Sequence, residues 1–204
     1  MNVTENKTYT LNRRKVVARL LEKRGSKENH DLLIITGLGS PTYDVHAAGD
    51  SDRNFYLWGA MGSASLVGFG LALSRPENRI LVITGDGEQL MGLGGLATIG
   101  VHNPANLSIV VLDNGHFGET GMQKSHTHYG VDLVGAARSC GINQAREFSD
   151  MEGIDSLAES LFAAEGTSFA TIRIKPENHA RSIPALDGRY LKNRFRENLG
   201  FTPL

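Results

Sequence analysis

The 204-residue sequence has few of the features that assign a chain to a class at once. A single cysteine, Cys140, excludes an internal disulfide and a four-cysteine zinc or iron–sulfur site, and it fits a reducing, cytoplasmic compartment. The longest apolar runs, at 66–73 and 109–112, are too short to cross a bilayer, and the polar first ten residues have no signal-peptide core. We therefore expect no membrane association.

The sequence also has no excess of positive or negative charge, since it contains 21 basic and 22 acidic residues. This balance argues against a nucleic-acid partner. Glycine, in contrast, is in excess: it accounts for 24 of 204 residues, against a usual ~7%. The glycines cluster, which indicates segments where the backbone lies close to something else.

Short apolar runs alternate with stretches of helical periodicity, a pattern that predicts an α/β fold with a parallel sheet and helices on both faces. We expect one domain over 1–204, with a loose tail at 1–10 and a C-terminal extension at 175–204. The expected strands are 32–36, 79–84, 107–112 and 168–174. The expected helices are one from 11 that stops at Gly25, a helix capped by Ser40, 63–73, a glycine-rich stretch at 88–101, 131–140, 155–164 and 190–198.

Three polar turns follow strands directly, at Gly37, Gly85 and Asn114. Ligands of parallel sheets bind beyond the carboxyl ends of the strands, so these turns point to one site. Asp86, between Gly85 and Gly87, is unusual beside a phosphate unless a cation lies between them. Asn114 supplies a second oxygen at the next strand end, ~5 Å away. The pair predicts a diphosphate held through Mg²⁺.

Gly85-Asp86-Gly87, followed after 26 residues by Asn114, resembles the thiamine diphosphate signature. The stretch 57–62, Leu-Trp-Gly-Ala-Met-Gly, resembles the segment under the cofactor's pyrimidine in 2-oxo acid decarboxylases. Over about 11–142, and again near 184–198, the chain is similar to sulfopyruvate and phosphonopyruvate decarboxylases. The similarity is to their C-terminal, diphosphate-binding domain or beta subunit.

This resemblance implies roles for individual residues. Asp86, Asn114 and the carbonyl of His116 would bind Mg²⁺. The Gly59 carbonyl would accept a hydrogen bond from the cofactor's 4′-amino group, and Met61 would separate its two rings. The residues implied at the diphosphate are Gly39, Ser40, Gly85, Gly87 and Glu88.

The family also needs a glutamate that protonates the pyrimidine, on a second α/β domain. No glutamate here matches that motif. The resemblance therefore implies a hetero-oligomer, in which a partner subunit with a pyrimidine-binding domain completes the active site for a small 2-oxo acid.

The loop at 116–130 is rich in titratable groups, and loops over such rims often carry reacting residues. It holds His116, His126, His128 and Glu119. Relatives of pyruvate decarboxylase carry a catalytic glutamate on this segment, so the resemblance implies proton transfer by Glu119, with His116 and His126 as further catalytic candidates. Two of the histidines could instead bind a second metal.

Two other functions remain open from sequence. The stretch 118–127 also resembles the beta subunit of 2-oxo acid:ferredoxin oxidoreductases, but with one cysteine any iron–sulfur cluster would have to lie on a partner. A non-catalytic, cofactor-binding regulatory module is the second alternative. The glycine pattern at 92–97 falls inside an expected helix rather than at a strand-to-helix turn, so we interpret it as close helix packing rather than dinucleotide binding.

Overall fold

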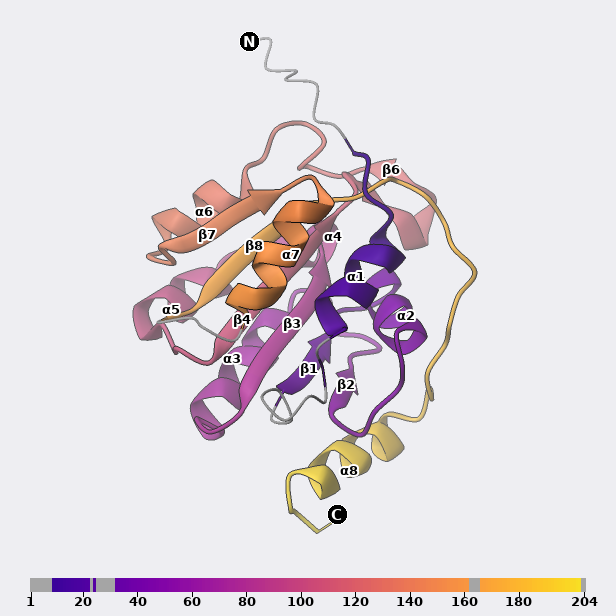
Figure 1. Ribbon diagram of the computed structural model, residues 1–204, viewed down its shortest axis with the longest axis vertical. Coiled ribbons are helices and arrows are strands. Elements are labelled where there is room, and N and C mark those ends of the chain that lie inside the picture. The colour runs from indigo at the N-terminus through magenta and orange to yellow at the C-terminus, as the bar shows by residue number, and fades with distance from the viewer. Residues whose placement is uncertain (1–8, 23, 25–31, 162–165, 203–204) are drawn as a thin grey trace.

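A six-stranded parallel sheet forms the centre of the computed structural model, which describes residues 9–22, 24, 32–161 and 166–202. The strand order is β2-β1-β3-β4-β8-β7, and helices cover both faces (Figure 1). The expected fold class is thus confirmed. Among the described residues, no helix is long and apolar enough to span a membrane.

The strands of the main sheet are β1 (Leu32–Thr36), β2 (Asn54–Tyr56), β3 (Arg79–Gly85), β4 (Leu107–Asp113), β7 (Gln144–Phe148) and β8 (Ser168–Arg173). A small antiparallel pair consists of β5 (His116–Phe117) and β6 (Gln123–Lys124), joined by a 3-10 turn at Gly118–Thr120. The helices are α1 (Arg13–Leu21), α2 (Ser40–Ala47), α3 (Ala64–Ser74), α4 (Asp86–Met91), α5 (Gly95–His102), α6 (Leu133–Ser139), α7 (Met151–Ser160) and α8 (Gly188–Asn198).

Two apolar cores lie on opposite faces of the sheet. One core joins α1, α2 and α7 to the sheet, and the other joins α3, α5 and α6. The central strands face both cores: every residue of β4 is buried, as its continuous apolar sequence predicts. α8 contributes Leu191 to the first core and Phe195 to the second, beside the edge strand β2.

The chain reverses its direction across the sheet between β1 and β3. From β1 it passes through α2 to β2 on one side, and from β3 it passes through α4 and α5 to β4 on the other. The connections after β1 and β3 therefore diverge and leave a crevice at the carboxyl ends of these strands. This is the place where open α/β sheets bind ligands.

Three helices begin earlier or later than their apolar periodicity predicts, because aspartates cap them. Asp132, Asp150 and Asp187 each accept hydrogen bonds from backbone N–H groups of the first turn. As a result α7 starts at Met151, where we expected 155, and α8 starts at Gly188, where we expected 190. The expected ends of the first helix, at Gly25, and of the 155–164 helix lie outside the described residues.

Other local expectations also need correction. Ser40 is the first residue of α2, and the cap is Gly39, whose φ of +81° places it in the left-handed region. Asp86 begins α4 directly, so it is not part of a free turn. β2 and β7 were not expected. β7 is an edge strand with mostly exposed side chains, so it lacks the apolar run that reveals a buried strand.

A matched pair of glycines on α3 tests the packing of this helix on the sheet. A Cβ at Gly68 would lie 2.2 Å from Val82 Cγ2 on β3, whereas a Cβ at Gly70 would meet nothing within 4 Å. We expect Gly68→Ala to lower the free energy of unfolding by about 1–3 kcal/mol, through overpacking. Gly70→Ala should raise it by about 0.5–1 kcal/mol, because alanine is the better helix former. Urea unfolding measures both, and equal midpoints would contradict this packing.

Candidate cofactor and metal site

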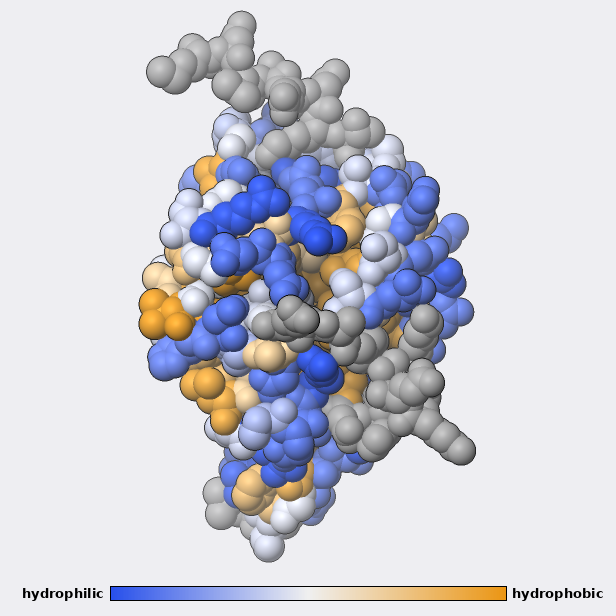
Figure 2. All heavy atoms as spheres, turned by 60° about the vertical axis from the view of Figure 1, so that its left-hand side comes forward, coloured by the Kyte–Doolittle hydropathy of each residue, from blue (hydrophilic) through white to orange (hydrophobic). Residues whose placement is uncertain are grey.

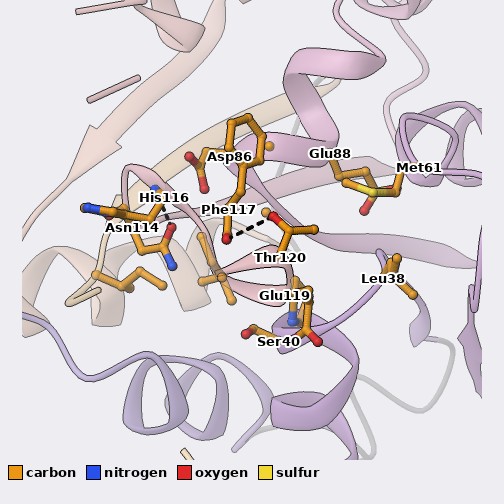
Figure 3. Close-up of a pocket in the computed structure, with 16 residues that line it drawn as sticks. Leu38, Ser40, Met61, Asp86, Glu88, Asn114, His116, Phe117, Glu119 and Thr120 are labelled. Atoms are coloured by element: carbon orange, nitrogen blue, oxygen red, sulfur yellow. Dashed lines mark hydrogen bonds between the residues drawn. The ribbon is translucent and has the colours of Figure 1, made fainter. Parts of the chain in front are cut away.

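One pocket opens in the crevice between β1 and β3 and extends to the end of β4 (Figure 3). Most of the residues proposed from sequence lie around it. The residues that line it are Leu38, Ser40, Pro41, Met61, Gly85, Asp86, Gly87, Glu88, Leu112, Asn114, His116, Phe117, Gly118, Glu119, Thr120 and Ile174. Gly39 adjoins this set through the side chain of Glu119, while Gly59 and His126 do not line the pocket.

Asp86 presents a carboxylate to the pocket from a position where it is only 2% exposed. Ser125 Oγ donates a hydrogen bond to its Oδ2, and Thr127 Oγ1 lies 3.2 Å from the same oxygen. In the described contacts neither hydroxyl donates to Oδ1. Burial, together with the nearby carboxylate of Asp113, raises the pKa of Asp86 to about 6. A cation at Oδ1 would offset both effects.

Asp113 is the second buried acid at these strand ends, and it is fully paired. Thr127 Oγ1 donates to its Oδ1 over 2.7 Å, and Arg173 forms an ion pair with its Oδ2. Arg173 also reaches Glu147 Oε2 over 2.5 Å. Thr127 thus bridges Asp86 and Asp113 and fastens the loop after β4 to the ends of β3 and β4.

Asn114 and His116 form a tight turn at the end of β4. The backbone N–H of His116 donates to Asn114 Oδ1 over 2.8 Å, and His116 Nδ1 lies 2.7 Å from the Asn114 carbonyl (Figure 3). The His116 ring is held beside the His128 ring, with their centroids 5.4 Å apart. The turn thereby places Asn114 and His116 at the pocket that Asp86 also lines.

Glu88 has a role that the sequence did not reveal. Its side chain, 4% exposed, accepts hydrogen bonds from Thr84 Oγ1 over 2.7 Å and from the backbone N–H of Ala64 over 3.2 Å. The backbone N–H groups of Leu38 and Gly62 also donate to it. Burial raises the pKa of this carboxyl. Glu88 therefore ties the β1–α2 loop and the Met61 loop to the start of α4.

Met61 lies at the mouth of the pocket and is 40% exposed. The loop that carries Met61 packs directly on the junction between α4 and α5, since a Cβ at Gly92 would lie 2.1 Å from the Gly62 carbonyl oxygen. Its neighbour Ala60 has a φ of +53°, in the left-handed region. The backbone around Met61 is thus held in place, while its side chain projects where another molecule can contact it.

The loop at 116–130 separates the proposed catalytic residues. Glu119 lines the pocket and lies beside Ser40 in Figure 3. His126 is exposed, with its ring against Phe117 at a centroid distance of 6.3 Å. Among the described residues, no group of three or more His, Cys, Asp or Glu side chains could hold a metal ion, so the second-metal alternative gains no support.

Ser125, Thr127 and Arg173 are the residues of this site that sequence reasoning missed. Ser125 and Thr127 lie 39 and 41 positions after Asp86, and Arg173 lies 60 positions after Asp113, so only the fold brings them to these two acids. The sequence contained a partial indication, because Ser125 and Thr127 lie within the 116–130 loop that we expected beside the strand ends.

Comparison with known proteins adds an independent line of evidence. The family described as "Thiamine pyrophosphate enzyme, C-terminal TPP binding domain" matches residues 41–173. The chain is 40% identical to sulfopyruvate decarboxylase subunit beta of Methanothermobacter thermautotrophicus, over 81% of this chain and 85% of that protein. It is 35% identical to phosphonopyruvate decarboxylase of Streptomyces viridochromogenes, over 76% of this chain and 39% of that protein.

Solved structures agree on the fold. Benzoylformate decarboxylase from Polynucleobacter necessarius superposes with a TM-score of 0.69 at 17% identity, covering 88% of this chain and 36% of that one. A 2-oxoglutarate:ferredoxin oxidoreductase from Magnetococcus marinus superposes with a TM-score of 0.64 at 19% identity, covering 87% and 66%.

The buried Asp113–Arg173 pair generates a stability test. Arg173→Met leaves the Asp113 carboxylate buried without its cation, and we expect a loss of about 3–5 kcal/mol in the free energy of unfolding. The double variant Arg173→Met/Asp113→Asn removes the uncompensated charge and should recover part of that loss. Urea unfolding measures both, with the exposed Arg189→Met as control. A double variant no more stable than the single one would contradict the ion pairing.

Proposed function

Because this chain belongs to the thiamine pyrophosphate enzyme family, we propose that it is the diphosphate-binding subunit of a 2-oxo acid decarboxylase. The main support is that Asp86, Asn114 and His116 line one pocket at the ends of β3 and β4. Relatives named sulfopyruvate decarboxylase subunit beta, which this chain nearly spans, support a 2-oxo acid with a second strongly acidic group. A cytoplasmic location belongs to the same proposal.

The residues present fit the cofactor and its metal. Mg²⁺ prefers one or two side-chain oxygens, completed by phosphate and water. Asp86 Oδ1, the Asn114 side chain and the His116 carbonyl would be its protein ligands. A Cβ at Gly85 would meet nothing within 4 Å, so the main chain there borders open space. Backbone groups of Gly39, Ser40, Gly87 and Glu88 would hold the diphosphate.

The bound cofactor would accept the electrons released when carbon dioxide leaves the substrate. This chain's residues would orient it: the Gly59 carbonyl would accept a hydrogen bond from its amino group, and Met61 would separate its rings. Glu119 would transfer a proton at the pocket mouth. His116 lines the pocket and could assist, whereas the exposed His126 would have to move toward the substrate to do so.

A partner subunit would supply the rest of the active site. Support comes from the surface of α3, α4 and α5, where 60–74 and 89–101 contain no Asp, Glu, Lys, Arg or His. Large apolar side chains on this surface are nonetheless 40–83% exposed: Met61, Leu66, Leu73, Met91 and Val101. We call these five the α3–α5 face. The helices are contiguous, since a Cβ at Gly95 on α5 would lie 3.0 Å from Leu66 Cγ on α3.

The position of the α3–α5 face connects assembly with the site. The face begins at Met61, at the pocket mouth, so a subunit bound to it would reach the same cofactor. Figure 2 shows one side of the molecule, on which small apolar patches lie among hydrophilic residues. Exposed apolar faces of this kind are typical of protein interfaces.

The metal assignment predicts a large loss of cofactor binding in two variants. Asp86→Asn keeps the shape of the side chain but removes the charge, and Asn114→Ala removes an oxygen. Loss of a direct ligand should cost more than the roughly 10–100-fold that loss of an outer partner costs. Calorimetry with thiamine diphosphate and Mg²⁺ measures the affinity, with the exposed Asp52→Asn as control. Normal binding by both variants would contradict the assignment.

The α3–α5 face predicts that single charges prevent assembly. Leu66→Glu and Val101→Glu place a carboxylate on exposed positions of α3 and α5, so the chain should fold but no longer bind its partner subunit. The matched control is Met151→Glu on α7, which lies on the opposite face of the sheet and is 39% exposed. Size-exclusion chromatography of co-expressed subunits measures assembly. Wild-type assembly by both face variants would place the interface elsewhere.

A further inference from the structure

A basic side chain reaches the mouth of the pocket from the segment between β8 and α8. This segment passes along the outer side of α2 (Figure 1). It is fastened there because Arg14 Nη2 donates to the Ala180 carbonyl over 2.7 Å and His46 Nδ1 lies 2.8 Å from Ser182 Oγ. Between these two attachments, the side chain of Arg181 reaches Glu119, which lines the pocket.

Arg181 and Tyr43 together hold the carboxylate of Glu119. Arg181 Nη2 lies 3.0 Å from Glu119 Oε2, and its guanidinium lies over the Tyr43 ring at 5.5 Å from the centroid. The hydroxyl of Tyr43, a residue that is 7% exposed, also hydrogen-bonds to Glu119. Glu119 itself lies against the phosphate-binding loop proposed above, because its Cγ would be 2.8 Å from a Cβ at Gly39.

The charges around the pocket are unbalanced without Arg181. Its described lining includes the acids Asp86, Glu88 and Glu119 and no lysine or arginine. The side chains of Arg181 and Glu119 are 57% and 35% exposed. The ion pair between them therefore contributes little to stability, and another anion can readily replace Glu119 in it. An arginine beside a tyrosine hydroxyl offers several donors to an anion with three oxygens.

We infer that Arg181 and Tyr43 form a subsite for a phosphate or sulfonate group, which the Glu119 carboxylate occupies until the ligand displaces it. The inference rests on the proposed function for the source of that group. It comes either from the far phosphate of the cofactor or from the second acidic group of the substrate. Displacement would also free Glu119 for proton transfer.

This arrangement predicts opposite effects of two variants. Arg181→Gln removes the charged donor and should weaken binding of the group roughly tenfold or more. Glu119→Gln removes the internal competitor and should strengthen it. A purely structural ion pair would give the same sign for both variants. Arg181→Lys should retain part of the affinity, and the exposed Arg189→Gln on α8 is the matched control.

The first experiment uses the full chain without a partner. Trp58 is the single tryptophan, and its ring lies 6.2 Å from that of Tyr43, so its fluorescence reports on this corner. Titration with inorganic sulfate and with thiamine diphosphate plus Mg²⁺ gives affinities for each variant. Urea midpoints equal to wild type establish that the variants are folded.

The second experiment measures KM and kcat of the assembled enzyme with sulfopyruvate and with pyruvate. A raised KM in Arg181→Gln for sulfopyruvate alone, with unchanged cofactor affinity, assigns the subsite to the substrate. A raised dissociation constant for the cofactor, with both acids affected equally, assigns it to the cofactor phosphate. Either result supports the inference.

Unchanged sulfate, cofactor and substrate affinities in Arg181→Gln would overturn it, as would a Glu119→Gln variant that binds more weakly. A wild-type enzyme that decarboxylates neither acid would contradict the proposed function instead. The fluorescence titrations would still test the subsite in that case.

Discussion

The buried bridge from Asp86 through Thr127 to Asp113 is the interaction on which the site depends. Two carboxylates at adjacent strand ends repel each other, and burial strengthens the repulsion. The structure compensates one of them with Arg173 and places hydroxyl groups of the loop at 116–130 against the other. Asp86 is thereby held in position with its charge uncompensated by any arginine or lysine in the described contacts, as a cation ligand should be.

The second organising contact is Glu88, which joins two loops to strand β3. A buried carboxylate that accepts hydrogen bonds from the β1–α2 loop, the Met61 loop and Thr84 fixes their mutual distance. Glycine is needed beside it, because a Cβ at Gly37 would lie 1.6 Å from Glu88 Oε2. The clustering of glycine in the sequence thus has a concrete cause, since the backbone approaches a buried side chain here and the backbone of another loop at Gly92.

Much of this could be predicted from sequence, and the remainder had identifiable reasons to be missed. Strands buried on both faces, such as β3 and β4, are recognised in the sequence by their continuous apolar runs. The polar residues that follow these runs indicated where the site lies. β7 escaped prediction because an exposed edge strand has no such run. The aspartate caps of α6, α7 and α8 were readable but were outweighed by periodicity.

The site's supporting residues were harder to foresee than the residues proposed as its ligands. Asp86 and Asn114 follow strands and belong to a motif. Arg173, in contrast, meets Asp113 only because β8 pairs with β4, and Thr127 meets Asp86 only through the return of a loop. Arg181 is further removed, because it lies in a segment without regular structure. Contacts of this kind depend on tertiary packing, which no local pattern encodes.

The central claim is that this chain holds a complete diphosphate site and only part of an active site. Calorimetric titration with thiamine diphosphate and Mg²⁺, on the chain alone and on the chain assembled with its partner subunit, tests it most directly. The account predicts weak, metal-dependent binding by the chain alone and much tighter binding by the assembly. Equal affinity in the two titrations would contradict it.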